Sequence, residues 1–459
     1  MTEQNQNALN DDANMILKYK NKIKNGNLQI EFDPEVINLR FVEKFNIQTL
    51  KFCIRIDMQV KLRSNTIKEL ILGTERFSIK RPQPLNLNVD DLELENLEVL
   101  DLERNQLIND QLYNIAKFKK LHSLNVSFNH VDLTHIHNIL SLTTLTMWSC
   151  GLTNIDQITS LINLENLNLC ANENIDIDPL CKVKSLINLN ISQCNLKQID
   201  QIGSLTNLEV LKVSDNQLLK IDSIRLLVKL KELDISLNEQ IDIAPLKDLV
   251  SLIKLDLSGC NLRSINALKS LITLQTLGLS SNYQINVSEL QYLRNLQYLN
   301  LDSCNLVSIY VLKPLMNLES LDIEYNNIVF LDANINEMSN LKEFKVQNNL
   351  VSDFLSLEKH PNFNNINKIG DRCFDISDQK YQSQEELYLE LLQANKFRKI
   401  ESPNIQLKEI QIQHKALKTA LDNFKQQINE AISNARQSQI QYTANVGRIF
   451  QQMNYVGFE

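Results

Sequence analysis

A leucine-rich pattern that returns every 22 residues constrains this chain more than any other feature. The pattern LxxLxLxxNxL begins at Leu97, Leu121, Leu142, Leu164, Leu186, Leu208, Leu230, Leu252, Leu274, Leu296, Leu318 and Leu341. From Leu142 to Leu318 every start follows the previous one by 22 residues. A fixed period of this length indicates a solenoid, in which similar supersecondary units stack along one axis.

Each unit has an alternating half followed by a half with a spacing of three. In residues 252–257, LIKLDL, alternation places Leu255 and Leu257 on one face of a short strand and Asp256 on the other. One unit cannot bury its apolar face alone, so neighbouring units must form a parallel sheet over a continuous core. In the second half, Ile265 and Leu268 are three residues apart, which suits 3₁₀ or α-helical turns on the convex side. We expect an α/β repeat solenoid, a horseshoe with a parallel sheet on its concave face, followed by an α-helical tail.

The repeat also divides the chain. Residues 97–352 are the regular repeats, and residues 27–96 hold divergent ones, with degraded copies at 47–52 and 67–72. Residues 1–26 are a polar N-terminus with a capping helix expected from Asp12, and residues 353–382 are expected to form a C-terminal cap. Such caps cover the exposed core at the ends of a solenoid.

Residues 383–459 lack the motif and are rich in glutamine and helix formers. The segment QEELYLELLQANKFRKI (384–400) predicts one helix that stops before Pro403. Residues 404–435 carry apolar side chains at steps of three and four, which is typical of a coiled coil. Two interpretations stay open: a coiled coil that forms a homodimer or docks a partner through 404–435, and helices that fold back on each other or on the solenoid.

The repeat strings resemble a known family. LINLNISQCNLKQIDQIGSLTN (186–207) and LIKLDLSGCNLRSINALKSLIT (252–273) resemble the SDS22-like subtype of leucine-rich repeat proteins, named for a phosphatase-regulating member with 22-residue units. NEQIDIAPLKDL (238–249) is similar to bacterial internalins, which are exported. The resemblance implies the fold and a role in binding, and no partner-specific string is recognisable here.

The ninth position of each unit, where the chain leaves the strand, is asparagine or cysteine. Asparagine there can satisfy backbone groups in the turn and form a ladder along the stack. Cysteine replaces it at Cys150, Cys194, Cys260 and Cys304, separated by 44, 66 and 44 residues. Units two apart place such cysteines roughly 10 Å apart, beyond the reach of a disulfide. No CxxC motif accompanies them, so we expect buried free thiols and a reducing compartment.

The alternation also identifies the side chains on the concave face, most of which are small and polar. Trp148 is the one tryptophan of the chain and points outward, with Phe128 near it on the preceding strand. Exposed aromatic residues flanked by charge are typical of binding hot spots. We therefore expect a protein partner to contact Glu103, Phe128, Trp148, Asp234, Asp256, Tyr298, Asp302, Asp322, Glu324 and Tyr325.

Composition limits the other classes of partner. Acidic residues outnumber basic ones by 55 to 47, giving a net charge of −8, which argues against nucleic acid and anionic membranes. The polar N-terminus lacks a signal-peptide pattern, and no apolar run of about 18 residues spans a bilayer. The expected location is the cytoplasm.

The sequence offers no catalytic or cofactor-binding motif. The nearest metal-like pattern is the pair His135 and His137, without a third ligand nearby. We interpret the chain as a non-catalytic protein-binding scaffold or adaptor without cofactors or metals. The alternatives are a protein phosphatase regulatory subunit, a coiled-coil assembly or cytoskeletal protein, and a secreted internalin-like adhesin.

Overall fold

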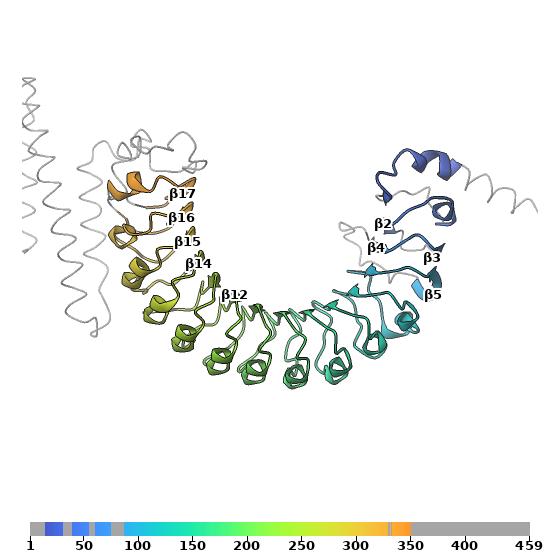
Figure 1. Ribbon diagram of the computed structural model, residues 1–459, viewed down its shortest axis with the longest axis horizontal. Coiled ribbons are helices and arrows are strands. Elements are labelled where there is room, and N and C mark those ends of the chain that lie inside the picture. Colours follow the sequence, from blue (N-terminus) through green and yellow to red (C-terminus); the bar gives the residue numbers. More distant parts are fainter. Residues whose placement is uncertain are drawn as a thin grey trace, which may run out of the picture.

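The computed structural model describes residues 14–30, 39–54, 60–74, 87–328, 331 and 333–349. Fifteen parallel strands stand side by side in one sheet, in chain order apart from β3 and β5. The described units curve into a horseshoe, with the strands along the inner side and short helical turns along the outer side (Figure 1). The repeat solenoid expected from the sequence is therefore confirmed. The expected C-terminal cap, helical tail and 404–435 coiled coil lie outside the described residues.

The strands are short, as the alternating halves predict. The main sheet contains β1 (Asn27–Ile30), β2 (Thr49–Ile54), β4 (Glu69–Thr74), β6 (Val99–Asp101), β7 (Ser123–Asn125), β8 (Thr144–Thr146), β9 (Asn166–Asn168), β10 (Asn188–Asn190), β11 (Val210–Lys212), β12 (Glu232–Asp234), β13 (Lys254–Asp256), β14 (Thr276–Gly278), β15 (Tyr298–Asn300), β16 (Ser320–Asp322) and β17 (Glu343–Lys345). In the regular units every strand pairs with the next at the same repeat position, as Leu233 pairs with Leu255. One unbroken register therefore carries equivalent side chains into columns across the sheet.

In the regular units the second half returns over the outer side in 3₁₀ turns, and one more 3₁₀ helix, η1, precedes β2 in the divergent N-terminal region. These helices are η1 (Arg40–Lys44), η2 (Asn109–Leu112), η3 (Ile115–Lys117), η4 (Ile136–Asn138), η5 (Asp156–Ser160), η6 (Asp178–Lys182), η7 (Asp200–Ser204), η8 (Asp222–Leu226), η9 (Ala244–Asp248), η10 (Asn266–Ser270), η11 (Ser288–Tyr292), η12 (Tyr310–Leu312) and η13 (Ala333–Glu337). Side chains three residues apart eclipse in a 3₁₀ helix, so Ile265 and Leu268 both point into the core. The leucines and isoleucines of both halves form one continuous buried cluster.

The N-terminal end departs from the regular pattern. Residues 14–20 are helical, and Tyr19 is buried in the core. A second parallel pair, β3 (Val60–Ser64) and β5 (Leu87–Leu94), lies on the outer side of β2 and β4 (Figure 1). The degraded copies at 47–52 and 67–72 thus supply true strands of the main sheet, while β3 and β5 replace the usual 3₁₀ turns.

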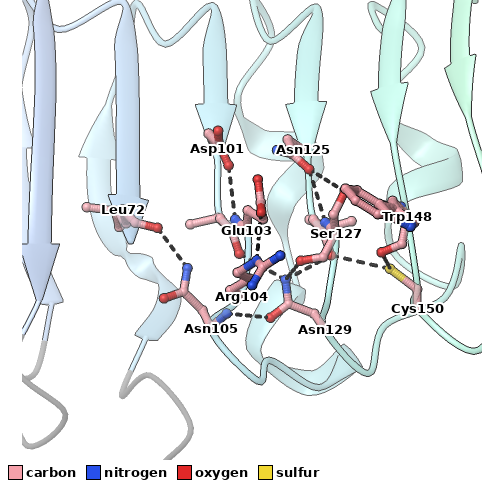
Figure 2. A network of polar contacts seen from close by, with 12 residues as sticks. Leu72, Asp101, Glu103, Arg104, Asn105, Asn125, Ser127, Asn129, Trp148 and Cys150 are labelled. Atoms are coloured by element: carbon pink, nitrogen blue, oxygen red, sulfur yellow. Dashed lines mark hydrogen bonds and ion pairs between the residues drawn. The ribbon is translucent and has the colours of Figure 1, made fainter. Parts of the chain in front are cut away.

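Asparagine amides link each turn to the turn before it. Asn172 accepts hydrogen bonds at Oδ1 from the backbone N–H groups of Cys150 (3.0 Å) and Leu152 (2.9 Å) in the preceding unit. Its Nδ2 donates to the carbonyl oxygens of Met147 (2.8 Å) and Leu169 (2.7 Å). Asn129 repeats the arrangement, since its Oδ1 accepts from the Asn105 backbone N–H and its Nδ2 donates to Leu102 O, and Figure 2 shows Asn105 and Asn129 in line with Cys150. The Asn105 amide keeps only the donor half, from Nδ2 to Leu72 O. The ladder expected from the sequence is therefore present.

Four units have a cysteine in place of this asparagine, and we call Cys150, Cys194, Cys260 and Cys304 the column cysteines. Each column cysteine keeps the donated hydrogen bond and lacks the accepting oxygen. Its thiol donates to the carbonyl that Asn Nδ2 would reach, as Cys194 Sγ does to Leu169 O at 3.3 Å. A thiol offers no amide oxygen to the N–H groups of the preceding turn. The turn of the unit before Cys194 is NENI (172–175), one residue longer than the CNL turn (194–196) that contains Cys194 itself. In the longer turn, Asn174 N–H donates to Cys194 O at 3.0 Å. The turn NEQI before Cys260 does the same through Gln240 N–H at 3.3 Å, so the longer turns supply the missing bond.

We expect Asn172→Ala to lower the free energy of unfolding by about 3 kcal/mol, because buried N–H and C=O groups on two units lose their partners. Urea titration followed by circular dichroism measures the loss. The control is Asn266→Ala, an exposed asparagine of η10, which should change stability by about 0.5 kcal/mol or less. Equal losses in the two variants would contradict the ladder's role.

The four column thiols should resist alkylation in the folded protein at pH 8. Burial raises the pKa of Cys150, Cys194 and Cys260 to about 11 and that of Cys304 to about 12, and the thiolate is the reactive form. Peptide mapping after brief iodoacetamide treatment should show the partly exposed Cys181 modified first. Full modification of all four after denaturation is the positive control. Native Cys260 reacting as fast as Cys181 would show that the turn is not closed.

Candidate functional site on the concave face

Every regular unit presents three side chains to the concave face, because they alternate with buried leucines. In the unit of β13 these are Lys254, Asp256 and Ser258, on either side of the buried Leu255 and Leu257. The register of the sheet aligns each of them with its equivalent in the next unit. The face is therefore a grid of three columns, and the ten side chains predicted from the sequence lie on it or at its edge.

The middle column has a structural task as well as an exposed surface. Its aspartates and asparagines accept, at Oδ1, the backbone N–H two residues further on, which ends the strand in a side-chain turn. This bond occurs at Asp101, Asn125, Asn168, Asn190, Asp234, Asp256, Asn300 and Asp322. The predicted contact residues Asp234, Asp256 and Asp322 therefore commit one carboxylate oxygen to their own backbone.

The residue after the third column is left-handed in all twelve regular units. Its φ is 62° at Arg104, 56° at Phe128, 54° at Leu237 and 51° at Tyr325, and only Gly259 in this column is a glycine. For other residues this conformation costs roughly 1 kcal/mol. A backbone bond to the next unit holds it, as Phe128 N–H donates to Trp148 O at 2.8 Å. This column therefore fixes large side chains along one edge of the concave face.

A contiguous cluster occupies this edge near the N-terminal end of the regular repeats. The Arg104 guanidinium carbon lies 4.1 Å from the centre of the Phe128 ring, and that ring lies 4.7 Å from Trp148 at 57°. Glu103 Oε1 is 2.9 Å from Arg104 Nε (Figure 2). Trp148 remains 37% exposed. The structure thus brings together three predicted residues from three successive units and adds Arg104.

Arg104 was missed by the sequence prediction, although a signal for it was present. It stands directly before Asn105, as Phe128 stands before Asn129, so both occupy the same position of their units. A planar guanidinium over an aromatic ring gains from cation–π attraction and buries apolar surface. We name Glu103, Arg104, Phe128 and Trp148 the aromatic cluster.

Beside the aromatic cluster the grid is uncharged over four strands, β7 to β10. Its three columns read Ser123, Asn125, Ser127, Thr144, Thr146, Trp148, Asn166, Asn168, Cys170, Asn188, Asn190 and Ser192. Side-chain hydrogen bonds tie some of them together, as Asn166 Nδ2 donates to Thr144 Oγ1 at 3.2 Å. Amides and hydroxyls both donate and accept, so this stretch suits neutral polar groups better than charged ones.

Charge returns from β11 onward. Glu232 lies between Lys212 (3.1 Å) and Lys254 (3.7 Å), and the column continues through Asp234 and Asp256. These pairs are partly exposed, so each contributes little to stability. They place side chains of both signs next to each other on β11 to β13, whereas β14 presents only Thr276, Gly278 and Ser280.

Acidic residues gather at the C-terminal end of the face. Burial, together with the nearby Asp322 carboxylate, raises the pKa of Asp302 and of Glu324. Lys345 Nζ lies 3.1 Å from Asp322 Oδ2, and this bond raises the lysine pKa. Tyr325 is largely exposed on the left-handed column beside Glu324. A cationic group from a partner would relieve the repulsion among these carboxylates.

The structure separates Tyr298 from this acidic end. Tyr298 begins β15 and pairs with Ser320, whereas Asp302 follows four residues later, roughly 13 Å along the strand. Both face the concave side, but they belong to opposite edges of the grid. The ten predicted residues therefore form two groups and several single positions, rather than one patch.

A cysteine on the concave side and the histidine pair singled out from the sequence have ordinary packing roles. Cys170 is buried on the concave side, with its Sγ 3.7 Å from Gln193 Oε1, and burial raises its pKa. His137 Nδ1 lies 2.9 Å from Leu133 O, and His135 packs edge-on against Tyr113. Within the described ranges, no group of three or more His, Cys, Asp or Glu residues is placed to hold a metal ion.

We expect Asp302→Asn to raise the melting temperature at pH 7.5 by about 1–3 °C, because the wild-type carboxylate is poorly solvated and repelled by Asp322. Its Oδ1 is buried without a hydrogen-bond partner among the described residues. A raised pKa means that the wild type gains stability as pH falls, so the difference should shrink towards pH 4.5. Thermal scans at both pH values measure this. Exposed Glu239→Gln is the control, and a destabilised Asp302→Asn at pH 7.5 would contradict the argument.

Comparison with known proteins bears on the fold. No family model matches the chain, and no curated protein matches it. Among solved structures, an internalin of Listeria monocytogenes is 25% identical with a TM-score of 0.53, over 59% of this chain and 79% of the internalin. A leucine-rich repeat protein of Leptospira interrogans is 23% identical with a TM-score of 0.51, over 67% of this chain and 89% of the other. The repeats described here therefore have the leucine-rich repeat fold.

Proposed function

We propose that this protein is a non-catalytic scaffold that binds a protein partner along its concave face, with the aromatic cluster as the anchor. The observation that carries the proposal is the stacking of Arg104, Phe128 and Trp148 across three units. Hot spots of protein interfaces are enriched in tryptophan, tyrosine and arginine, held rigidly and shielded by neighbouring contacts. The backbone bonds of the left-handed column give this cluster such rigidity before any partner arrives.

The rest of the face supports a partner of defined polarity. The stretch from β7 to β10 is neutral, so the part of the partner beside Trp148 should carry few charges. The acidic end, with Asp302, Asp322, Glu324 and Tyr325, favours a basic group some seven strands away, or about 34 Å. A partner that spans both ends would be oriented by charge and anchored by aromatic contacts.

We also infer that the protein works in a reducing compartment such as the cytoplasm. Six cysteines in the described ranges, Cys150, Cys170, Cys181, Cys194, Cys260 and Cys304, are free thiols. A secreted protein with this many cysteines would be expected to pair some of them. In the same ranges, no helix combines the length and apolarity needed to cross a bilayer.

The aromatic cluster should decide which protein is captured. We expect Trp148→Ala and Arg104→Ala each to weaken binding about 30-fold or more, since hot-spot truncations cost about 2 kcal/mol or more. The wild-type chain and each full-length variant are immobilised separately and exposed to lysate. The proteins recovered on each are then compared by quantitative mass spectrometry. The melting temperature should change little, because Trp148 is partly exposed. A phosphatase among the proteins lost would favour the regulatory-subunit alternative.

The matched control is Tyr310→Ala, an exposed aromatic residue of η12 on the outer side. It should recover the same proteins as the wild type. Identical recovery by Trp148→Ala and the wild type would refute the anchor, as would unfolding of Trp148→Ala. Deletion of residues 383–459 distinguishes the concave-face scaffold from the coiled-coil assembly alternative. Only a coiled-coil assembly protein should lose all of its activity when these residues are removed.

A further inference from the structure

A second surface, separate from the concave face, runs along the sheet edge where the strands begin. The residue two before each repeat start is Val228, Val250, Ile272, Arg294 and Met316 in five successive units. Val228, Val250 and Ile272 are each more than half exposed, and so is Leu226 beside them. We name Leu226, Val228, Val250, Ile272 and Met316 the edge row. Val228, Val250 and Ile272 are exposed aliphatic side chains in three consecutive units, and Arg294 separates them from Met316. Such a run is unlike the single exposed residues common on any surface.

A second side-chain ladder fixes the spacing of the edge row. In three successive units, at Thr273, Asn295 and Asn317, the next residue along the chain donates to the carbonyl at the row position of the preceding unit. Thr273 Oγ1 bonds Val250 O at 2.7 Å, and Asn295 Nδ2 bonds Ile272 O at 2.8 Å. These bonds tie the carbonyl groups of Val250 and Ile272 to the next unit and so hold the row positions at the spacing of the repeat. From Val228 to Met316 there are four unit steps, at least about 19 Å.

Basic residues accompany the edge row on an otherwise acidic chain. Three residues before the row positions stand Arg225, Lys247, Lys269, Gln291 and Lys313, on or beside the 3₁₀ helices. Arg225 pairs with Asp222 and Asp248, and Lys269 lies 5.6 Å from the Tyr292 ring. With Arg294 in the row itself, the surface combines an apolar stripe and an excess of positive charge. Its complement is an acidic segment with regularly spaced apolar residues.

The chain itself contains such a segment. Residues 384–392, QEELYLELL, hold three glutamates, four leucines and a tyrosine, and no basic residue. The heptad-like stretch 404–435 matches less well, since its four lysines outnumber its three acidic residues. We propose that residues 384–392 bind the edge row of the same chain, with their leucines on the apolar stripe and their glutamates towards Lys247, Lys269 and Lys313. This proposal does not depend on the function of the concave face.

Reach and dimensions are compatible with this pairing. The described solenoid ends at Asn349, and 34 residues separate it from Gln384. Because the segment and the edge row belong to one chain, their pairing is intramolecular and modest contacts suffice. As a helix, residues 384–392 would be about 13.5 Å long, which covers the three unit steps, about 14 Å, from Lys247 to Lys313. The pairing would leave the concave face open and cover a stripe that is otherwise exposed to water.

Zero-length carbodiimide cross-linking of the full chain tests the proposal. The reagent joins carboxylates to amines that are in contact, so Glu385, Glu386 or Glu390 should couple to Lys247, Lys269 or Lys313. A mixture of ¹⁴N- and ¹⁵N-labelled chains shows whether each coupled pair belongs to one molecule. Val250→Glu/Ile272→Glu and, separately, Leu389→Glu should lower the yield about tenfold or more, since each removes apolar contact.

Ile162→Glu is the matched control, because Ile162 is 71% exposed at the same repeat position but outside the edge row. It should keep the wild-type yield. Coupling of Lys231 to Glu209, whose Nζ and Oε2 are 2.8 Å apart, confirms in every sample that the reagent works. The proposal is overturned if the coupled pairs join light and heavy chains or lie at other lysines. The proposal is also overturned if the Val250→Glu/Ile272→Glu variant keeps the wild-type yield. It is overturned as well if no glutamate of 384–392 couples while the Lys231–Glu209 product forms normally.

Discussion

The exchange of hydrogen bonds between successive turns is the interaction on which the solenoid depends. Strands of three residues contribute few ladder bonds, and the leucine core alone does not fix how one unit rotates on the next. Each asparagine amide reaches backbone groups on two units at once, as Asn326 does with Cys304 N–H and the carbonyls of Leu301 and Ile323. Since a buried peptide group is costly to leave unpaired, these bonds hold every unit at one angle. Regular columns of surface side chains follow from that regularity.

The core of this fold leaves the concave grid nearly free for recognition. Leucines at the buried positions make the sheet whatever stands between them, so the outward columns can vary from unit to unit. The middle column is the exception, because its aspartates and asparagines also close the strand ends. The third and left-handed columns carry no such duty at Trp148, Phe128 or Tyr325. Residues there are the ones whose identity is best explained by a partner.

Much of this architecture could be predicted from the sequence, because in a strict repeat the position of a residue within its unit determines whether its side chain points into the core or outward. Leu255 inward, Asp256 outward and Cys260 in the turn all followed from counting, and the structure places them so. Arg104 was missed because its role depends on contact with Phe128 of the next unit. The repeat period alone does not show which position of each unit has a left-handed backbone. The pair β3 and β5 was missed because residues 60–64 and 87–94 do not follow the repeat pattern. The tail was beyond counting altogether, since it has no register with the solenoid.

The column cysteines show how a local exception can be regular at a longer range. Considered by itself, Cys260 weakens the ladder, because its thiol donates one hydrogen bond to Ile235 O but offers no oxygen to the N–H groups of the preceding turn. Read with its neighbour, it belongs to a two-unit arrangement in which the longer turn NEQI brings Gln240 N–H to the Cys260 carbonyl. The same pairing joins NENI to Cys194, and the sequence places NYQI before Cys304. At Cys194 and Cys260 the longer turn of the preceding unit thus supplies a backbone bond where the thiol offers none, and the same sequence pattern precedes Cys304.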